Sequence, residues 1–589
     1  MIHTKLAMQA CAGRAMKFVA ASVASTLLLT TGYSSVALAQ QSPTTTGVNS
    51  GELLRGYFAP RLTTPTMDVV NARKAEELKR FQQLGSIPGV GPETIVINEV
   101  LFYGNDNVEN SELQQVIEAF LKRPLTAADL SDAALAVSDV YHQRGFLAAQ
   151  VVVPPQEIVD GRVAFWVLEG YLDKDGIVLD DYSNDTVSID YIKRILTREI
   201  TEGSPIERHE YERALRIVED LPGVHVESRI FPGTEVGTGR LGVDIYQTEP
   251  LTALLSYDNS GFYGTGIHRA TAFGRSENVF GGHEALSLTF STSGSAQRYV
   301  GVDGDVPLGS AGWKIGALAS YMDYAMRDEY NTSNEHGWGT VFGVRAYYPL
   351  MLLRDTTVSV TASLNRSVMA DEYDDYDDYE RNVDVAEMTF HGDHADLSGV
   401  TSFAAHFFAG HVDITEGTDF GKTEGGFGVA ELHASRLQEF GNRFNGYVEG
   451  KLQVSTQNLD GLMRCSIGGP DSNRGYAVGE VSADQCFVVN SDIRYDLDQD
   501  LLPGAAQVGA FVDYSLSQQD HTDISGVDNH RNSLASIGVL ANLQVSDSSF
   551  LNASLGYQLT ESEEKKSLGN QADYRSSPVR FWLQAVIQF

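Results

Sequence analysis

Apolar and polar residues alternate along the chain from residue 249 to residue 589. Leu286, Leu288 and Phe290, for example, alternate with Ser287 and Thr289. A period of two is that of a β-strand, whose successive side chains point to opposite faces. Sixteen such runs, each of about ten residues, fill this part of the chain, and no helical pattern interrupts them. They begin near Leu251, Gly266, His283, Gln297, Trp313, Gly337, Thr356, Arg381, Thr401, Gly425, Phe444, Phe487, Ala506, Ser533, Phe550 and Val579.

Residues 93–248 have a different rhythm that occurs twice. A strand, two amphipathic helices and two strands are predicted in residues 93–170, and the same order returns in residues 171–248 with a period of about 80 residues. The first segment has helices over 110–121 and 127–143 and strands over 95–102, 148–153 and 162–168. The second has helices over 189–198 and 207–219 and strands over 176–179, 224–231 and 240–246. Two βααββ modules are the simplest account.

The strand-rich part reads as a transmembrane β-barrel. Its strands have one apolar and one small or polar side, and short turns alternate with long polar connections, as in barrels whose apolar side meets lipid. An even number of strands closes without an unpaired edge. If the two modules lie in the periplasm, the long connections all fall outside the cell; they span residues 323–336, 369–380, 410–424, 457–486, 516–532 and 560–578. An ordinary β-sandwich is the alternative.

The N-terminus predicts export. Basic residues precede an apolar run at 18–29 and then Ala37-Leu38-Ala39, so residues 1–39 read as a signal peptide. Residues 40–92 read as a tether with two candidate helices, 50–58 and 66–84. Cleavage removes Cys11 and leaves Cys465 and Cys486, which we expect to form a disulfide in an oxidising compartment, with two unpaired thiols as the alternative.

Charge and candidate chemistry exclude several functions. The net charge of -35 argues against a nucleic-acid partner. The acidic run 371–380 has carboxylates enough for Ca²⁺ but not the ligand spacing of a dedicated site, so a solvated extracellular loop is favoured. His391, Asp393, His394 and Asp396 read as a polar periplasmic turn without a metal-ligand spacing. No cofactor, metal site or catalytic constellation is predicted, so the chain is not expected to be an enzyme.

Three blocks resemble one known family. The first is Tyr-His-Gln-Arg-Gly-Phe at 141–146, followed by Val-Pro-Pro-Gln-Glu-Ile-Val-Asp-Gly-Arg at 153–162 and Leu-Glu-Gly at 168–170. The second is Tyr-Asp-Asn-Ser-Gly at 257–261 with Gly-Thr-Gly at 264–266, and the third is Gly-Gly-Pro at 468–470 with Asn-Arg-Gly-Tyr at 473–476. Together they resemble the two-partner secretion transporters that export haemolysins and filamentous haemagglutinin, relatives of the outer-membrane barrel assembly factors. The final strand, which ends on Phe589, is similar to the signal read by that assembly machinery.

The resemblance implies a fold and a site. The fold is an α+β pair of polypeptide-transport-associated (POTRA) domains, residues 93–170 and 171–248, followed by a 16-stranded transmembrane β-barrel over residues 249–589. The site is the sixth extracellular loop, which folds back into the lumen in this family. Its motif residues are Asn473, Arg474, Gly475 and Tyr476, and its partners on the barrel wall are Phe511 and Asp513. The alternative is that Arg474 is a solvated loop residue.

The implied function is protein transport across the bacterial outer membrane. The POTRA domains would capture an unfolded secreted exoprotein of the adhesin, cytolysin or toxin type, and the barrel would pass it to the cell surface without ATP. Residues 224–230 and 207–219 of the second module are the expected contact. One of the two tether helices would plug the resting pore, and an ordinary linker helix is the alternative. Outer-membrane lipid and the barrel assembly machinery are the other expected partners. An assembly factor for other barrels, a passive porin and a barrel enzyme such as a lipase are the alternatives.

Overall fold

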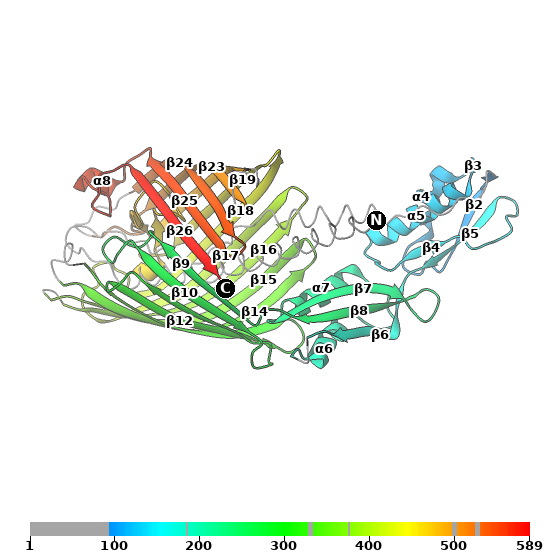
Figure 1. Cartoon of the computed structure of the whole chain (residues 1–589), viewed down its shortest axis with the longest axis horizontal. Helices are drawn as coiled ribbons and strands as arrows, with labels where there is room; N and C mark the ends of the chain where they lie inside the picture. Colours follow the sequence, from blue (N-terminus) through cyan, green and yellow to red (C-terminus); the bar gives the residue numbers. More distant parts are fainter. Residues whose placement is uncertain (1–93, 184–185, 328–333, 375–376, 498–503, 525–530) are drawn as a thin grey trace.

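The computed structural model describes residues 94–589 except 184–185, 328–333, 375–376, 498–503 and 525–530. It consists of a large barrel with two small α+β modules at one end (Figure 1). The second module lies against the barrel and the first lies beyond it. The predicted signal peptide, tether and plug helices fall outside the described residues.

The first module, POTRA 1, packs two helices on a three-stranded sheet of order β2-β5-β4. Its elements are β1 (Ile95–Val96), β2 (Glu99–Tyr103), α4 (Asn110–Ile117), η1 (Glu118–Phe120), β3 (Pro124–Leu125), α5 (Ala127–Gln143), β4 (Gln150–Val152) and β5 (Arg162–Leu168). The side chain of Thr126 accepts a hydrogen bond from the backbone N–H of Asp129 and so caps α5. The single strand predicted over 95–102 is divided, because β1 pairs with β3 and β2 with β5.

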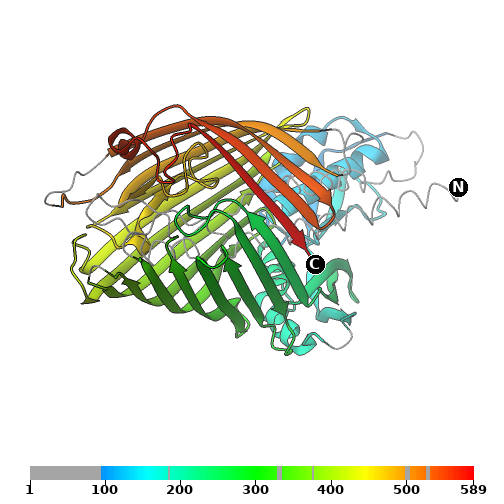
Figure 2. The ribbon, with the colours of Figure 1, turned by 60° about the vertical axis from the view of Figure 1, so that its left-hand side comes forward.

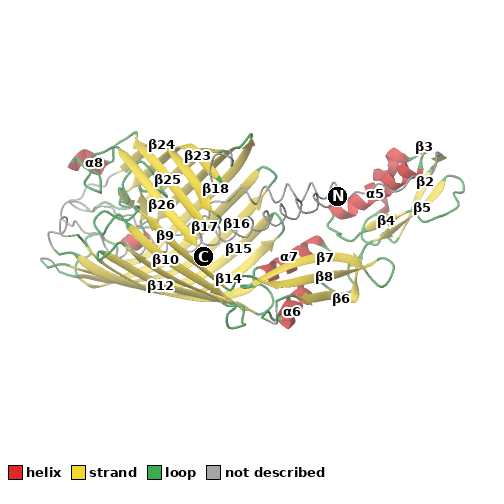
Figure 3. Cartoon of the chain, viewed as in Figure 1, coloured by secondary structure: helices red, strands yellow, loops and turns green. Residues whose placement is uncertain are grey.

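The second module, POTRA 2, repeats this arrangement with the sheet order β6-β8-β7. Its elements are β6 (Tyr171–Asp181), α6 (Ile189–Glu199), α7 (Arg208–Glu219), β7 (Val224–Pro232) and β8 (Thr238–Gln247). Apart from these modules, the barrel part has one short helix, α8 (Glu563–Leu568), and one 3-10 turn among the described residues (Figure 3). No helix in the described part of the chain is long and apolar enough to cross a membrane.

The barrel closes through sixteen antiparallel strands, as predicted. They are β9 (Leu251–Asp258), β10 (Arg269–Glu277), β11 (Ala285–Thr292), β12 (Gln297–Leu308), β13 (Trp313–Ala325), β14 (His336–Leu352), β15 (Thr356–Glu372), β16 (Tyr379–Ala395), β17 (Gly399–Glu416), β18 (Gly425–Gly441), β19 (Phe444–Ser455), β22 (Gln485–Asp496), β23 (Ala506–Gln518), β24 (Arg531–Ser546), β25 (Ser549–Gln558) and β26 (Val579–Gln588). The last strand pairs with the first, from Gln584 opposite Asp258 to Gln588 opposite Leu254. Figure 2 shows β26 beside β9 at this seam.

Side-chain alternation gives the barrel its two faces. Leu286, Leu288 and Phe290 are 40%, 54% and 45% exposed, whereas Ser287 and Ser291 on the same strand are buried. The exposed apolar face is the one that lipid covers, and the small and polar face lines the interior.

Several strands are longer than predicted. Strands β14 to β18 have 17 or 18 residues, because the alternation continues beyond the apolar band. The loop predicted over 369–380 is therefore wrong at both ends: β15 runs to Glu372 and β16 starts at Tyr379. The turn predicted around His391 is also misplaced, since His391, Asp393 and His394 lie within β16.

Candidate functional site: the sixth loop and the barrel wall

The sixth extracellular loop, L6 (residues 456–484), joins β19 to β22 and turns into the barrel. It contains the 3-10 turn η2 (Gly461–Met463) and a small hairpin, β20 (Cys465–Ile467) with β21 (Val481–Ala483). Nearly all of residues 458–484 are buried. A disulfide joins Cys465 in β20 to Cys486 at the start of β22. The base of L6 is thus covalently tied to the barrel wall.

The wall that faces L6 is strand β23. Val512, Tyr514 and Leu516 are 39–50% exposed on the lipid side, whereas Phe511 and Asp513 are 2% and 0% exposed on the inner side. An ionised carboxylate buried in this way requires a charged partner or several hydrogen-bond donors.

Arg474 supplies that partner. Its Nε donates to both carboxylate oxygens of Asp513 at 3.2 and 2.9 Å, and its Nη2 donates to Oδ1 at 2.6 Å. The backbone N–H of Arg474 donates to Oδ2 at 2.9 Å. The guanidinium carbon lies 3.7 Å from the centre of the Phe511 ring, close enough for a cation–π contact. Arg474 also approaches Asp492, at 3.4 Å from Nη1 to Oδ2. The alternative of a solvated Arg474 is wrong, because its side chain is only 11% exposed.

The neighbouring motif residues fix the backbone of the tip. Asn473 accepts a hydrogen bond from the Ser536 hydroxyl at 2.7 Å. Gly475 donates its N–H to the same hydroxyl at 3.2 Å, and a Cβ on Gly475 would lie 2.4 Å from that of Ser536. The fully buried Tyr476 donates its hydroxyl proton toward the carbonyls of Ala535 and Thr560, at 3.0 and 2.8 Å. These contacts require a residue without a side chain at position 475.

Three wall residues that complete this site were not predicted from the sequence. They are Ser536 on β24, Gly556 on β25 and Trp582 on β26. The indole N–H of Trp582 donates to the carbonyl of Arg474 at 2.8 Å, and a Cβ on Gly556 would lie 2.4 Å from the same oxygen. The sequence signal that could have found these residues is strand register. Asp513 pairs with Ser536, and small residues at successive inward-facing positions leave space for a loop.

POTRA 2 contacts the periplasmic end of the barrel through α7. Arg213 donates to the carbonyl of Pro349 at 3.1 Å, and Glu212 accepts from the backbone N–H of Arg354 at 2.9 Å. His283, in the turn between β10 and β11, stacks on Tyr191 of POTRA 2 with the ring centres 5.6 Å apart. Burial lowers the pKa of His283.

The contact between POTRA 2 and the barrel uses part of the region that was expected to contact a client. Part of the helix at 208–219 faces the barrel, whereas β7 has β8 as its one neighbour among the described strands and forms the outer edge of its sheet. The N–H groups of Val224 and Val226 already donate to the carbonyl of Leu221 and to the carboxylate of Glu219, so the available edge is the part of β7 after Val226, and the helix is partly used for docking.

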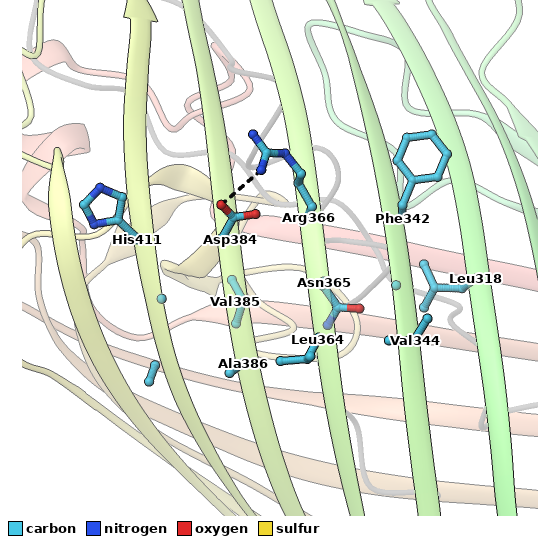
Figure 4. Close-up of a pocket in the computed structure, with 13 residues that line it drawn as sticks. Leu318, Phe342, Val344, Leu364, Asn365, Arg366, Asp384, Val385, Ala386 and His411 are labelled. Atoms are coloured by element: carbon cyan, nitrogen blue, oxygen red, sulfur yellow. Dashed lines mark hydrogen bonds and ion pairs between the residues drawn. The ribbon is translucent and has the colours of Figure 1, made fainter.

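A groove of about 710 Å³ lies across β13 to β17 (Figure 4). Arg366 and Asp384 on its rim form an ion pair, with 3.4 Å between Nη1 and Oδ2, and both side chains are more than half exposed. These two residues point outward, since the inward side of the same hairpin carries Asn365 and Val385. The groove belongs to the outer surface and not to the L6 site.

The remaining candidate chemistry is dispersed. No group of three or more His, Cys, Asp or Glu side chains among the described residues could hold a metal ion. Within the acidic run 371–380, Asp371 is fully buried and pairs with Arg381 at 2.7 Å, so the prediction of a wholly solvated loop is wrong for this residue.

Fold and site together define a class: outer-membrane β-barrels that carry periplasmic POTRA domains and an inward-folded sixth loop. A family model described as haemolysin secretion/activation protein ShlB/FhaC/HecB matches residues 237–539, and a ShlB-type POTRA model matches residues 95–170. The chain therefore belongs to the haemolysin secretion/activation family of transporters. Its barrel lies in the outer membrane, and its POTRA domains lie in the periplasm.

Individual relatives are distant but cover most of the chain. The heme/hemopexin transporter protein HuxB of Haemophilus influenzae is 23% identical over 503 residues, which cover 83% of this chain and 86% of the relative. The outer membrane transporter CdiB of Escherichia coli is 21% identical over 477 residues, covering 77% and 79%. The solved structure of CdiB from Escherichia coli covers 90% of this chain and all of its own, with a TM-score of 0.65 and 16% identity. CdiB from Acinetobacter baumannii gives a TM-score of 0.59 with 15% identity and covers 90% of this chain and all of its own. These likenesses support the fold.

Proposed function

We propose that this protein captures one unfolded secreted partner in the periplasm and moves it through the barrel to the cell surface without ATP. Arg474, with Asn473, Gly475 and Tyr476, would hold L6 against the wall residues Phe511 and Asp513 and so set the resting state of the pore. The observation that carries the proposal is the bidentate Arg474–Asp513 pair on the inner wall.

The POTRA domains have the complementary role of receiving the client. Beyond Val226, strand β7 offers backbone N–H and C=O groups along its outer edge, and an extended segment can pair with such an edge with little regard to sequence. POTRA 2 lies against the barrel, so a client on β7 is held near the periplasmic opening. The free energy for transport would come from folding of a β-rich client outside the cell.

The test compares the secreted proteins of cells with and without the transporter. We expect loss of one secreted protein while other outer-membrane proteins keep their levels. A general fall in outer-membrane proteins would instead indicate an assembly factor. Export that stops on ATP depletion, with the proton gradient and periplasmic supply held constant, would contradict the energetic part.

A further inference from the structure

The stem of L6, residues 458–464, is buried as deeply as its tip but lies on a different part of the wall. Leu459, Leu462 and Met463 join one apolar cluster with inward-facing residues of seven consecutive strands, β12 to β18, among them Met322 and Met369. Met322 and Met369 are 0% and 1% exposed, so protein and not water fills the lumen here. These contacts lie toward the extracellular ends of the strands.

A buried arginine fastens this stem to the wall. Arg381 on β16 donates from Nε to Asp460 of the stem at 2.6 Å and from Nη1 to Asp371 on β15 at 2.7 Å. Asp371 also accepts from the Tyr324 hydroxyl at 2.8 Å. The three charged side chains are 0–3% exposed.

This contact is separate from the Arg474 site. Arg381 lies on β16 and Asp513 on β23, five strand positions apart around the barrel. L6 is therefore tied to two regions of the wall, its tip by its own arginine and its stem by an arginine of the wall. A planar guanidinium can serve two carboxylates at once, which an ammonium group does less well.

We propose that Arg381 is a positioning residue that holds the L6 stem across the extracellular exit, so that release of Asp460 from Arg381 is a step in opening the barrel. The inference rests on the proposed function in one respect, that the client passes through the lumen. A polypeptide can leave past β12 to β18 only when the stem moves off the apolar cluster, and breaking the ion pairs exposes that cluster to water. Arg381 thus sets how often the exit opens.

The experiment measures exposure of the stem without any client. Leu462→Cys in the full-length protein places a thiol in the apolar cluster, and the native cysteines are silent because they are bonded to each other. Whole cells are treated with a membrane-impermeant maleimide. We expect slow labelling with Arg381 present and labelling at least about tenfold faster with Arg381→Met, since Asp371 and Asp460 then lose the guanidinium group that joins them. Arg381→Lys should restore part of the protection.

The matched control is Arg366→Met, which removes an arginine from the neighbouring strand of the same hairpin but on its outward side. It should leave the labelling rate unchanged. The heat-dependent gel shift of a folded barrel checks assembly, and Asp460→Asn, which keeps the shape of the side chain, gives a second route to the same acceleration.

Equal labelling of the parent, Arg381→Met and Asp460→Asn variants would overturn the inference. It would do so even if the parent exports its partner, in which case the proposed function stands. Faster labelling in a protein that exports nothing would keep the inference and remove the proposed function.

Discussion

Arg474→Ala is the most informative single change in this molecule. It removes three side-chain hydrogen bonds of 2.6–3.2 Å to Asp513 and the contact with Phe511, and it leaves a carboxylate that is 0% exposed. Breaking a buried pair by removing one partner costs about 3–5 kcal/mol. The backbone N–H at position 474 can still donate to Asp513, so we take the lower end, about 3 kcal/mol, which lowers the equilibrium constant for docking of the tip by about a hundredfold.

The assay is secretion of the partner protein, with the heat-dependent gel shift as a test of barrel assembly. We expect export to be lost while the barrel still assembles, because the strands keep their own hydrogen bonds. Arg494→Ala is the matched control: Arg494 also faces inward and pairs with Asp492, at 2.6 Å from Nε to Oδ1, but it has no described contact with Asp513. Normal export by the Arg474→Ala protein would refute the role given to this pair, and equal loss in both variants would show that only the charge of the lumen matters.

Two further predictions concern close packing and pH. Gly475→Ala should cost about 1–3 kcal/mol through its clash with β24 and reduce export, whereas Gly450→Ala, where an added Cβ meets nothing within 4 Å, should not; equal export by both would contradict the packing argument. Burial lowers the pKa of His283, so docking of POTRA 2 should be fully stable above the free-histidine pKa of about 6.5 and weaken as pH falls below it, because the undocked state then binds more protons. Protease sensitivity of POTRA 2 in the full-length protein between pH 7.5 and 5 measures this, and His283→Phe should remove most of the pH dependence.

Much of the architecture could be predicted from the sequence, because strands and helices have different hydrophobic patterns. Apolar and polar side chains alternate along a barrel strand and do not alternate along a helix. The character of residues such as Leu286 and Ser287 therefore indicates which face of the barrel each one lies on. Strands β9, β12, β13, β15, β18, β19, β23 and β26 begin at the predicted residue. The lengths of β14 to β18 could not be predicted from the sequence, since the alternation of side chains does not mark where the membrane ends.

Only part of the site could be predicted from the sequence. Arg474 and Asp513 lie 39 residues apart, and only a family motif connected them. No motif connects Arg381, Asp371 and Asp460, and Asp371 begins a run of acidic residues that looks like a solvated loop. The burial of Asp371 depends on the register of β15 with β16. In this register Asp371 is opposite Tyr379 and Met369 is opposite Arg381, so Asp371 lies two residues along β15 from the position that pairs with Arg381.

Strand β15 connects two features that were described separately. The turn before it holds Arg354, whose backbone N–H donates to α7 of POTRA 2, and its far end holds Asp371, which receives Arg381. Seventeen residues of extended chain make the strand roughly 55 Å long. It is hydrogen-bonded to both neighbours along this length and can shift but hardly stretch. The POTRA 2 contact and the Arg381–Asp371 pair therefore lie at the two ends of one stiff strand, and we expect a displacement of POTRA 2 to be transmitted along β15 to Asp371.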